Sequence, residues 1–306
     1  MRPRLALLGL ASALLAGCGS TGGGPREPGQ AHRGTLESLW RGHGESVGLL
    51  SGTSDYAPGL VRVSFLVVRH DGRLVTTPRA RLLVARGLGL PPFARGTARL
   101  ERVGVPGADL DTGDVTHLYV GHLRLRRPGR YWLLAQPLGV RGRPIRAAGT
   151  LDVRPKAASP AVGSRAYPSR TPTLASAHGD LGLLTTRVPP DRGLLRYSIA
   201  ESLAAHRPFV VVFATPKFCT SRTCGPVVDV VDTARRRFRG SGIRFVHVEI
   251  YRGNDPTLGF NRFVRQWHLP TEPWIFLVGA DGRIKAKFEG SVSLEELAAA
   301  VRRFLL

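Results

Sequence analysis

The chain has 306 residues, of which 42% are hydrophobic, and a formal net charge of +22. The length favours two domains, and the hydrophobic fraction can supply packed cores, which excludes an intrinsically disordered chain. A strongly basic chain suggests nucleic-acid binding. The arginines are instead scattered over both halves without a recognition motif, as in GC-rich coding bias, so we expect no nucleic-acid partner. The charge should still attract the protein to anionic lipid headgroups non-specifically.

The N-terminus predicts export. Arg2 and Arg4 precede an apolar stretch at residues 5–15, which has the length of a signal-peptide core and is too short to span a bilayer. The run Leu-Ala-Gly-Cys that ends at Cys18 resembles the bacterial lipobox, whose cysteine receives a diacylglyceryl group. That resemblance implies lipidation of Cys18 and a protein anchored by lipid to the extracytoplasmic face of the cell membrane. The alternative is an ordinary cleaved signal peptide with an incidental cysteine.

Short strands separated by turns follow. Residues 60–69 are rich in β-branched and aromatic residues and end at a His-Asp-Gly turn signal, and further strands are expected at 81–85, 98–103, 115–125, 130–135 and 150–153. This pattern predicts a small all-β sandwich. The segment Pro-Gly-Arg-Tyr-Trp at residues 128–132 resembles the entry to a late strand of immunoglobulin-like sandwiches.

The C-terminal part alternates helices and strands. Strands are expected at 208–213, 243–250, 274–278 and 283–288, with helices at 199–206, 226–238, 256–267 and 294–305. Such alternation predicts an α/β domain with a parallel core to which the last hairpin adds an antiparallel strand. We therefore divide the chain into a signal peptide (1–18), a flexible tether (19–45), a β-sandwich domain (46–155), a linker and entry segment (156–190) and an α/β domain (191–306).

Cys219 and Cys224 lie between the first strand and second helix of the α/β domain. In an exported protein they are expected to form a disulfide. Residues five apart on a regular helix point ~140° apart, so both cysteines cannot bond from within one helix. Cys219 should therefore lie in the preceding loop, with Cys224 near the first helical turn, where Gly-Pro at 225–226 is favourable.

This order of elements, with the cysteines opening a helix, resembles the thioredoxin fold. Pro273 precedes Gly282 by nine positions, the spacing between the cis-proline and the turn glycine in exported thioredoxins of the cytochrome-maturation type. The resemblance covers about residues 190–306. It implies a redox-active Cys219–Cys224 pair, a cis bond before Pro273, and a substrate-docking surface bordered by Glu272, Pro273 and Trp274.

Thioredoxin-like chemistry implies that Cys219 attacks and Cys224 resolves, through mixed disulfides with exported protein substrates and without a metal or cofactor. A helix N-terminus favours the thiolate, and Lys217 and Arg222 act in the same direction. The motif departs from the family, which has two residues between its cysteines where this chain has four. Residues 208–213 also lack the family's buried acid, and Glu272 would oppose thiolate formation if it points inward.

Three alternatives remain open. The pair could be a structural disulfide in a redox-inactive domain. A thiol peroxidase is similar in its cysteine spacing, although Pro216 stands where that family has threonine. A copper-binding module is suggested by the soft thiolates and by His268 near Pro273, although His268 is more readily explained as a packing residue.

Overall fold

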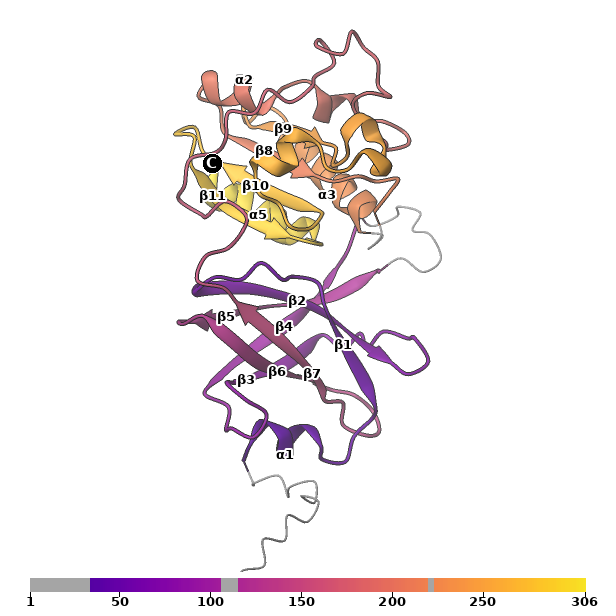
Figure 1. The fold of residues 1–306 in the computed structure, drawn as a ribbon. Helices are drawn as coiled ribbons and strands as arrows, with labels where there is room; N and C mark the ends of the chain where they lie inside the picture. The colour runs from indigo at the N-terminus through magenta and orange to yellow at the C-terminus, as the bar shows by residue number, and fades with distance from the viewer. Residues whose placement is uncertain (1–33, 106–114, 220–222) are drawn as a thin grey trace, which may run out of the picture. The chain divides into compact units, whose positions relative to one another are not determined.

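The structure, a computed structural model, describes residues 34–105, 115–219 and 223–306 (Figure 1). Its helices, strands and short 3₁₀ turns (η) are, in chain order, α1 (Leu36–Trp40), β1 (Val47–Ser51), β2 (Gly59–Arg69), β3 (Arg79–Ala85), β4 (Ala94–Arg102), β5 (His117–Leu125), β6 (Gly129–Pro137), β7 (Ala147–Val153), η1 (Arg192–Leu195), α2 (Ile199–Ala204), β8 (Phe209–Phe213), α3 (Cys224–Arg237), β9 (Arg244–Val248), η2 (Arg252–Asn254), η3 (Pro256–Leu258), α4 (Arg262–Gln266), β10 (Trp274–Val278), β11 (Ile284–Glu289) and α5 (Leu294–Phe304).

Strands β1 to β7 form one antiparallel sheet in the order β1-β2-β5-β4-β3-β6-β7. Isolated parallel bridges, Glu45 to Ile145 and Tyr56 to Val153, bring the two edges of the sheet together, so that it curves around its own core. The sequence predicted a small all-β sandwich. In the structure the seven strands are continuous, because β3 and β4 pair from Arg79–Arg99 to Val84–Ala94.

Helix α1 lies in the segment that the sequence assigned to a flexible tether. Thr35 caps the helix by accepting a hydrogen bond from the Ser38 N–H, and Leu36 is fully buried with Leu83 and Leu134. The boundary expected at residue 45 is therefore wrong, and the packed chain begins by residue 35. A helix of five residues is too short to show the periodicity by which helices are recognised in a sequence.

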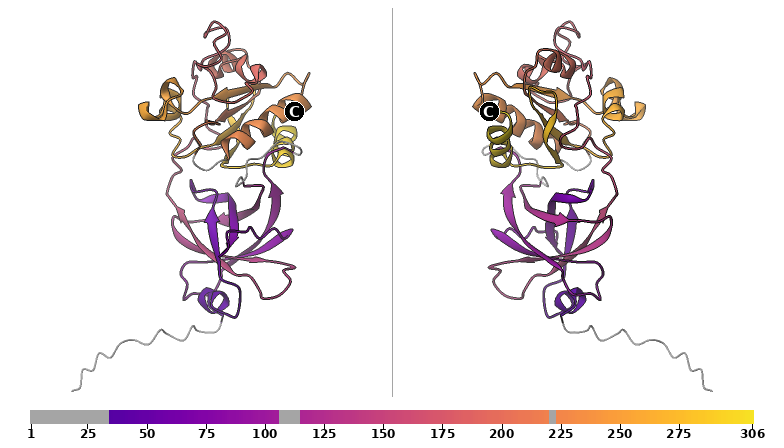
Figure 2. Two further views of the ribbon diagram at one scale, coloured as in Figure 1. Left: turned by 90° about the vertical axis from the view of Figure 1, so that its right-hand side faces the viewer. Right: turned by 90° about the vertical axis from the view of Figure 1, so that its left-hand side faces the viewer.

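The second sheet has the strand order β11-β10-β8-β9 (Figure 1). All five residues of β8 are buried, as expected for a strand covered on both faces. Val210 and Val212 pack with α3 and α5 on one face. Phe209, Val211 and Phe213 pack on the other face with a cluster that includes residues of α2 and α4. Figure 2 shows α3 and α5 side by side.

The expected parallel core is only partly observed. Strands β8 and β9 are parallel, but β10 runs antiparallel to β8, and β11 runs antiparallel to β10. The helix expected at 256–267 is broken into η3 and the five-residue α4, so the connection from β9 to β10 lacks a helix long enough to return the chain across the sheet. This connection instead delivers β10 to the other side of β8, in the opposite direction.

The predicted linker at 156–190 forms no regular helix or strand, yet it packs against the second sheet. The N–H groups of Gly163 and Ala166 donate to the carbonyls of Ile284 and Gly282, and the Ile284 N–H donates to Ser164. This segment therefore lies along β11.

Candidate functional site

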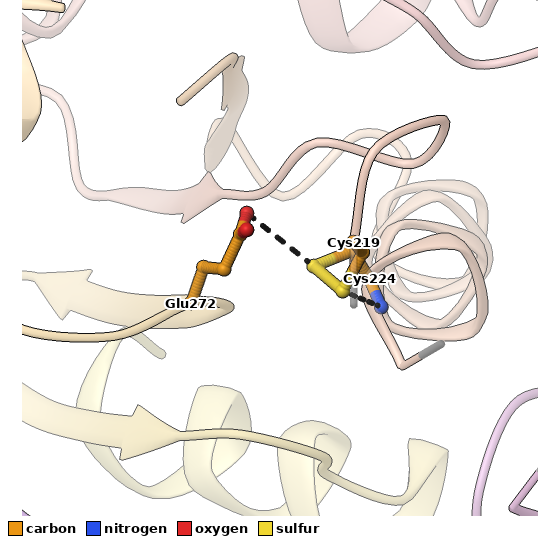
Figure 3. A group of neighbouring side chains, drawn as sticks. All are labelled: Cys219, Cys224 and Glu272. Atoms are coloured by element: carbon orange, nitrogen blue, oxygen red, sulfur yellow. Dashed lines mark hydrogen bonds between the residues drawn. A yellow bond between two sulfur atoms is a disulfide. The ribbon is translucent and has the colours of Figure 1, made fainter. Parts of the chain in front are cut away.

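Cys219 and Cys224 form a disulfide, with their Cα atoms 5.9 Å apart (Figure 3). Cys219 lies in the loop after β8, and Cys224 is the first residue of α3. Both placements confirm the prediction from helix geometry. The loop is needed because the pair could not close within a regular helix.

The helix start is directed at the sulfur of Cys219. The backbone N–H of Cys224 donates to Cys219 Sγ over 3.3 Å. Helix α3 has 14 residues, so its N-terminus carries an appreciable positive partial charge. In the reduced protein, this hydrogen bond and this charge would favour a thiolate on Cys219.

The two sulfurs differ in accessibility. Cys224 is fully buried, whereas Cys219 is partly exposed at the surface. A thiol of another protein could therefore reach Cys219 and not Cys224.

Glu272 faces the disulfide, as Figure 3 shows. Its Oε2 lies 3.7 Å from Cys224 Sγ, while the hydroxyl of Tyr251 donates to its Oε1 over 3.4 Å. The bond between Glu272 and Pro273 is cis, as the alignment of Pro273 predicted. Glu272 therefore points inward, the orientation in which the sequence predicted that it would oppose thiolate formation.

Burial, together with the smaller effect of the negative charge of Glu249, raises the pKa of Glu272 to about 7. Hydrogen bonds from Tyr251 and from the Thr215 N–H oppose this rise only in part. The carboxyl group is therefore about half protonated near neutral pH. When protonated it can donate to Cys224 sulfur, and when ionised it can accept a proton from a Cys224 thiol.

The topology explains why these residues meet. Strands β8 and β9 are parallel, so the segments that follow them, with Cys219 and Tyr251, leave the same edge of the sheet. Strand β10 is antiparallel, so Glu272, which precedes it, arrives at that edge. Sequence reasoning missed Tyr251 and Glu249. Both residues follow shortly after β9, which is parallel to β8, so their position in the chain could have placed them at the edge of the sheet where the cysteines lie.

Trp274 is 1% exposed, which makes its ring unavailable to a docking protein. Its ring stacks on Phe276 at 5.6 Å, and its indole N–H donates to Thr271 Oγ1 over 3.1 Å. Of the three residues expected at the docking surface, Glu272 faces the disulfide, Pro273 is buried beside it in the chain, and Trp274 belongs to the core.

Lys217 is exposed, with its Nζ 5.3 Å from the centre of the Phe218 ring. Arg222, the other expected basic neighbour, and Cys18, the expected lipidation site, lie outside the described residues. Within the described parts of the chain, no helix has both the length and the apolar character needed to cross a membrane.

The groups of Cys219, Cys224 and Glu272 that could bind a metal lie within 4.8 Å of one another. His268 is not in this set. Its ring packs edge-on against Tyr167, with 6.1 Å between the ring centres, which supports the packing role.

Compared with the models of known protein families, the chain matches none, and no curated protein sequence matches it either.

Proposed function

We propose that the protein is a thiol-disulfide oxidoreductase that acts on exported proteins, and that residues 191–306 form a thioredoxin-like domain. The observation that carries this proposal is the placement of the Cys219–Cys224 disulfide, which opens a helix after a buried strand and faces the cis bond before Pro273. The strand order β11-β10-β8-β9 supports the same fold.

We further propose that residues 46–155 form an immunoglobulin-like domain. Within the continuous sheet, the strand orders β1-β2-β5-β4 and β3-β6-β7 correspond to the ABED and CFG halves of that fold, and pairing of β4 with β3 joins the two halves here. Lipidation of Cys18 would hold both domains at the extracytoplasmic face of the membrane. A Cys18→Ser variant should then leave the membrane fraction, and one that stays there would contradict the anchor.

Oxidation of a substrate dithiol would proceed in two exchanges. A substrate thiolate attacks Cys219 Sγ, the Cys219–Cys224 bond breaks, and Cys224 leaves and takes a proton. A second substrate thiolate then attacks the substrate sulfur of the mixed disulfide, which releases Cys219 and leaves the substrate disulfide and the reduced protein. Reduction of a substrate is the same sequence in reverse.

The partial exposure of Cys219 favours thiol-disulfide exchange over a purely structural disulfide, because exchange requires an accessible sulfur and a structural role does not.

A second candidate function is metal binding in the reduced state. The short distances of both sulfurs from Glu272 support it. Titration of the reduced protein with Cu(I) or Zn²⁺ would test it, and a stoichiometric complex that is lost in Glu272→Gln would favour it.

Trapping of mixed disulfides tests the proposed function. Cys224→Ser cannot resolve a mixed disulfide, so it should accumulate adducts with exported proteins through Cys219 that dithiothreitol releases. Cys219→Ser is the matched control and should form few adducts, because Cys224 is buried. Equal trapping by both variants, or none by either, would overturn the proposal.

A further inference from the structure

A cavity of about 320 Å³ adjoins the disulfide site. One side is lined by Thr223, Thr271 and Glu272. Thr223 directly precedes Cys224, and Glu272 contacts Cys224 Sγ. The cavity therefore borders two residues that are next to Cys224, one in the chain and one in space.

Most of the remaining lining comes from the seven-stranded sheet and its flanking segments. Its apolar residues, Leu50, Phe65, Leu66, Val115 and Leu118, form an apolar wall beside the small polar residues Ser51, Thr53, Ser54 and Ser64. Leu66 and Val115 pack with Leu118 in a small cluster separate from the core that the sheet encloses. Apolar residues on the outer face of an antiparallel sheet need a cover, since that face is usually polar.

Leu50 is 56% exposed although it borders this apolar wall. Its side chain would lose water contact if an apolar group entered the cavity. An apolar ligand in the cavity would therefore bury the Leu50 side chain, which the described residues leave exposed.

The cavity lining also contains a buried hydroxyl group, that of Ser64, for which the described residues supply no hydrogen bond. The residue as a whole is fully buried. The backbone N–H of Ser64 donates to Thr53 Oγ1, so only the hydroxyl is left. A buried hydroxyl without a partner is costly, and a ligand with a peptide group could satisfy it.

We propose that this cavity binds a polypeptide substrate by an apolar side chain adjacent to its reactive cysteine. The inference rests on the proposed function and gives the seven-stranded sheet a role in it. The occupant is a peptide for two reasons. The neighbouring disulfide reacts with thiols, and the lining combines an apolar wall with a hydroxyl suited to a backbone group. A volume of this size lies at the lower end of ligand pockets and fits a leucine or phenylalanine side chain.

The test compares two peptides that differ in the residue beside a single cysteine, leucine in one and glycine in the other. Each cysteine carries 2-nitro-5-thiobenzoate in a mixed disulfide, so attack by reduced Cys219 on the peptide sulfur releases a coloured thiolate. We expect the leucine peptide to react about tenfold faster or more, as an apolar group in a fitted pocket implies. In Leu50→Asp the ratio of the two rates should fall close to one.

Leu60→Asp is the matched control. Leu60 is 63% exposed on β2 and is absent from the cavity lining, so this variant should keep the wild-type ratio. Equal rates for the two peptides in the wild-type protein, or an equal loss in Leu50→Asp and Leu60→Asp, would overturn the cavity assignment.

Binding of the same peptides with serine in place of cysteine, measured by fluorescence anisotropy, separates this inference from the proposed function. Tighter binding of the leucine peptide without release of coloured thiolate would support the cavity and refute the redox activity. Release of the coloured thiolate from both peptides at the same rate, with equal binding of the two serine peptides, would support the redox activity and refute the cavity assignment.

Discussion

At the scale of single residues, the carboxyl group beside the buried sulfur has an unexpected origin. Strand β8 supplies no acid, and Glu272 reaches Cys224 instead from the segment before β10. A group with a pKa of about 7 can donate a proton at neutral pH and accept it back. Glu272 is therefore suited to protonate Cys224 as it leaves the disulfide.

Glu272→Gln should change the pH dependence of disulfide reduction by dithiothreitol. After correction for the thiolate fraction of the reductant, the wild-type rate should fall as pH rises through about 7, because Glu272 loses the proton that it donates. The variant should show no inflection there. Stopped-flow measurement from pH 5.5 to 8.5 would decide it, and an unchanged inflection in the variant would contradict this role.

The raised pKa of Glu272 also makes the stability of the folded protein depend on pH. A carboxyl group whose pKa is higher in the folded protein binds its proton more tightly there than in the unfolded chain. Glu272 therefore lowers the stability of the oxidised protein as pH rises from about 4.5 to about 7. Glu272→Gln should flatten the pH dependence of the melting temperature in that window, while a steeper dependence would contradict the burial of this group.

At the scale of elements, a polar cluster around the buried Asp55 joins β11 to two segments of the chain. One segment connects β1 and β2, and the other follows β7. Asp55 is buried and accepts hydrogen bonds from Arg154, from the Ala158 N–H and from both the N–H and the hydroxyl of Ser159. Lys287 donates to the Ser159 hydroxyl over 2.6 Å. This arrangement fixes the start of the predicted linker against both sheets.

Asp55→Asn should destabilise the protein by about 3 kcal/mol near pH 7, because the Lys287 side chain, which is only 20% exposed, loses the negative charge of a buried carboxylate. Burial alone would raise the pKa of Asp55, but the hydrogen bonds from Ser159 and Ala158 and the charge of Lys287 hold the pKa below its ordinary value. The contribution is thus complete above the unfolded pKa of about 4 and is lost as pH falls through the lower folded pKa.

Denaturant unfolding at pH 7 and at pH 3 measures this difference. Asp152→Asn is the control, since its pair with Arg130 is exposed and should contribute little. Equal stability of Asp55→Asn and the wild-type protein at pH 7 would show that the cluster is not stabilising.

At the scale of the whole molecule, Arg62 connects the two sheets. Its guanidinium group donates to both carboxylate oxygens of Glu296 on α5, over 2.7 and 2.9 Å, and to the carbonyls of Glu289 and Ser291. The Arg62 side chain is only 10% exposed. A two-point contact of this kind is among the stronger hydrogen-bonding arrangements in proteins.

Arg62→Ala should cost about 3 kcal/mol and separate the thermal unfolding of the two sheets into two transitions, because the Glu296 side chain, which is 16% exposed, loses its charged partner. Differential scanning calorimetry would resolve them. Arg130→Ala, which removes an exposed pair, should keep the wild-type profile. A single unshifted transition in Arg62→Ala would show that this contact does not couple the sheets.

Local features of the sequence predicted the disulfide, the loop position of Cys219 and the position of Cys224 near the first helical turn, because each depends on residues near one another in the chain. The resemblance to thioredoxins implied the cis bond before Pro273. The direction of β10 and the contact of Glu272 with Tyr251 depend on how distant segments cross the sheet, which hydrophobic periodicity does not specify. The cavity was beyond prediction for the same reason, since its lining joins strands and loops more than 200 residues apart.

The reduction potential of the Cys219–Cys224 couple tests the central claim most directly. Equilibration of the purified protein with dithiothreitol of defined redox state, followed by thiol labelling and mass spectrometry, would measure it. An exchanging pair should have a potential above about −300 mV, whereas structural disulfides lie below that value. A potential well below −300 mV, with no exchange on the time scale of minutes, would show that the bond serves stability alone.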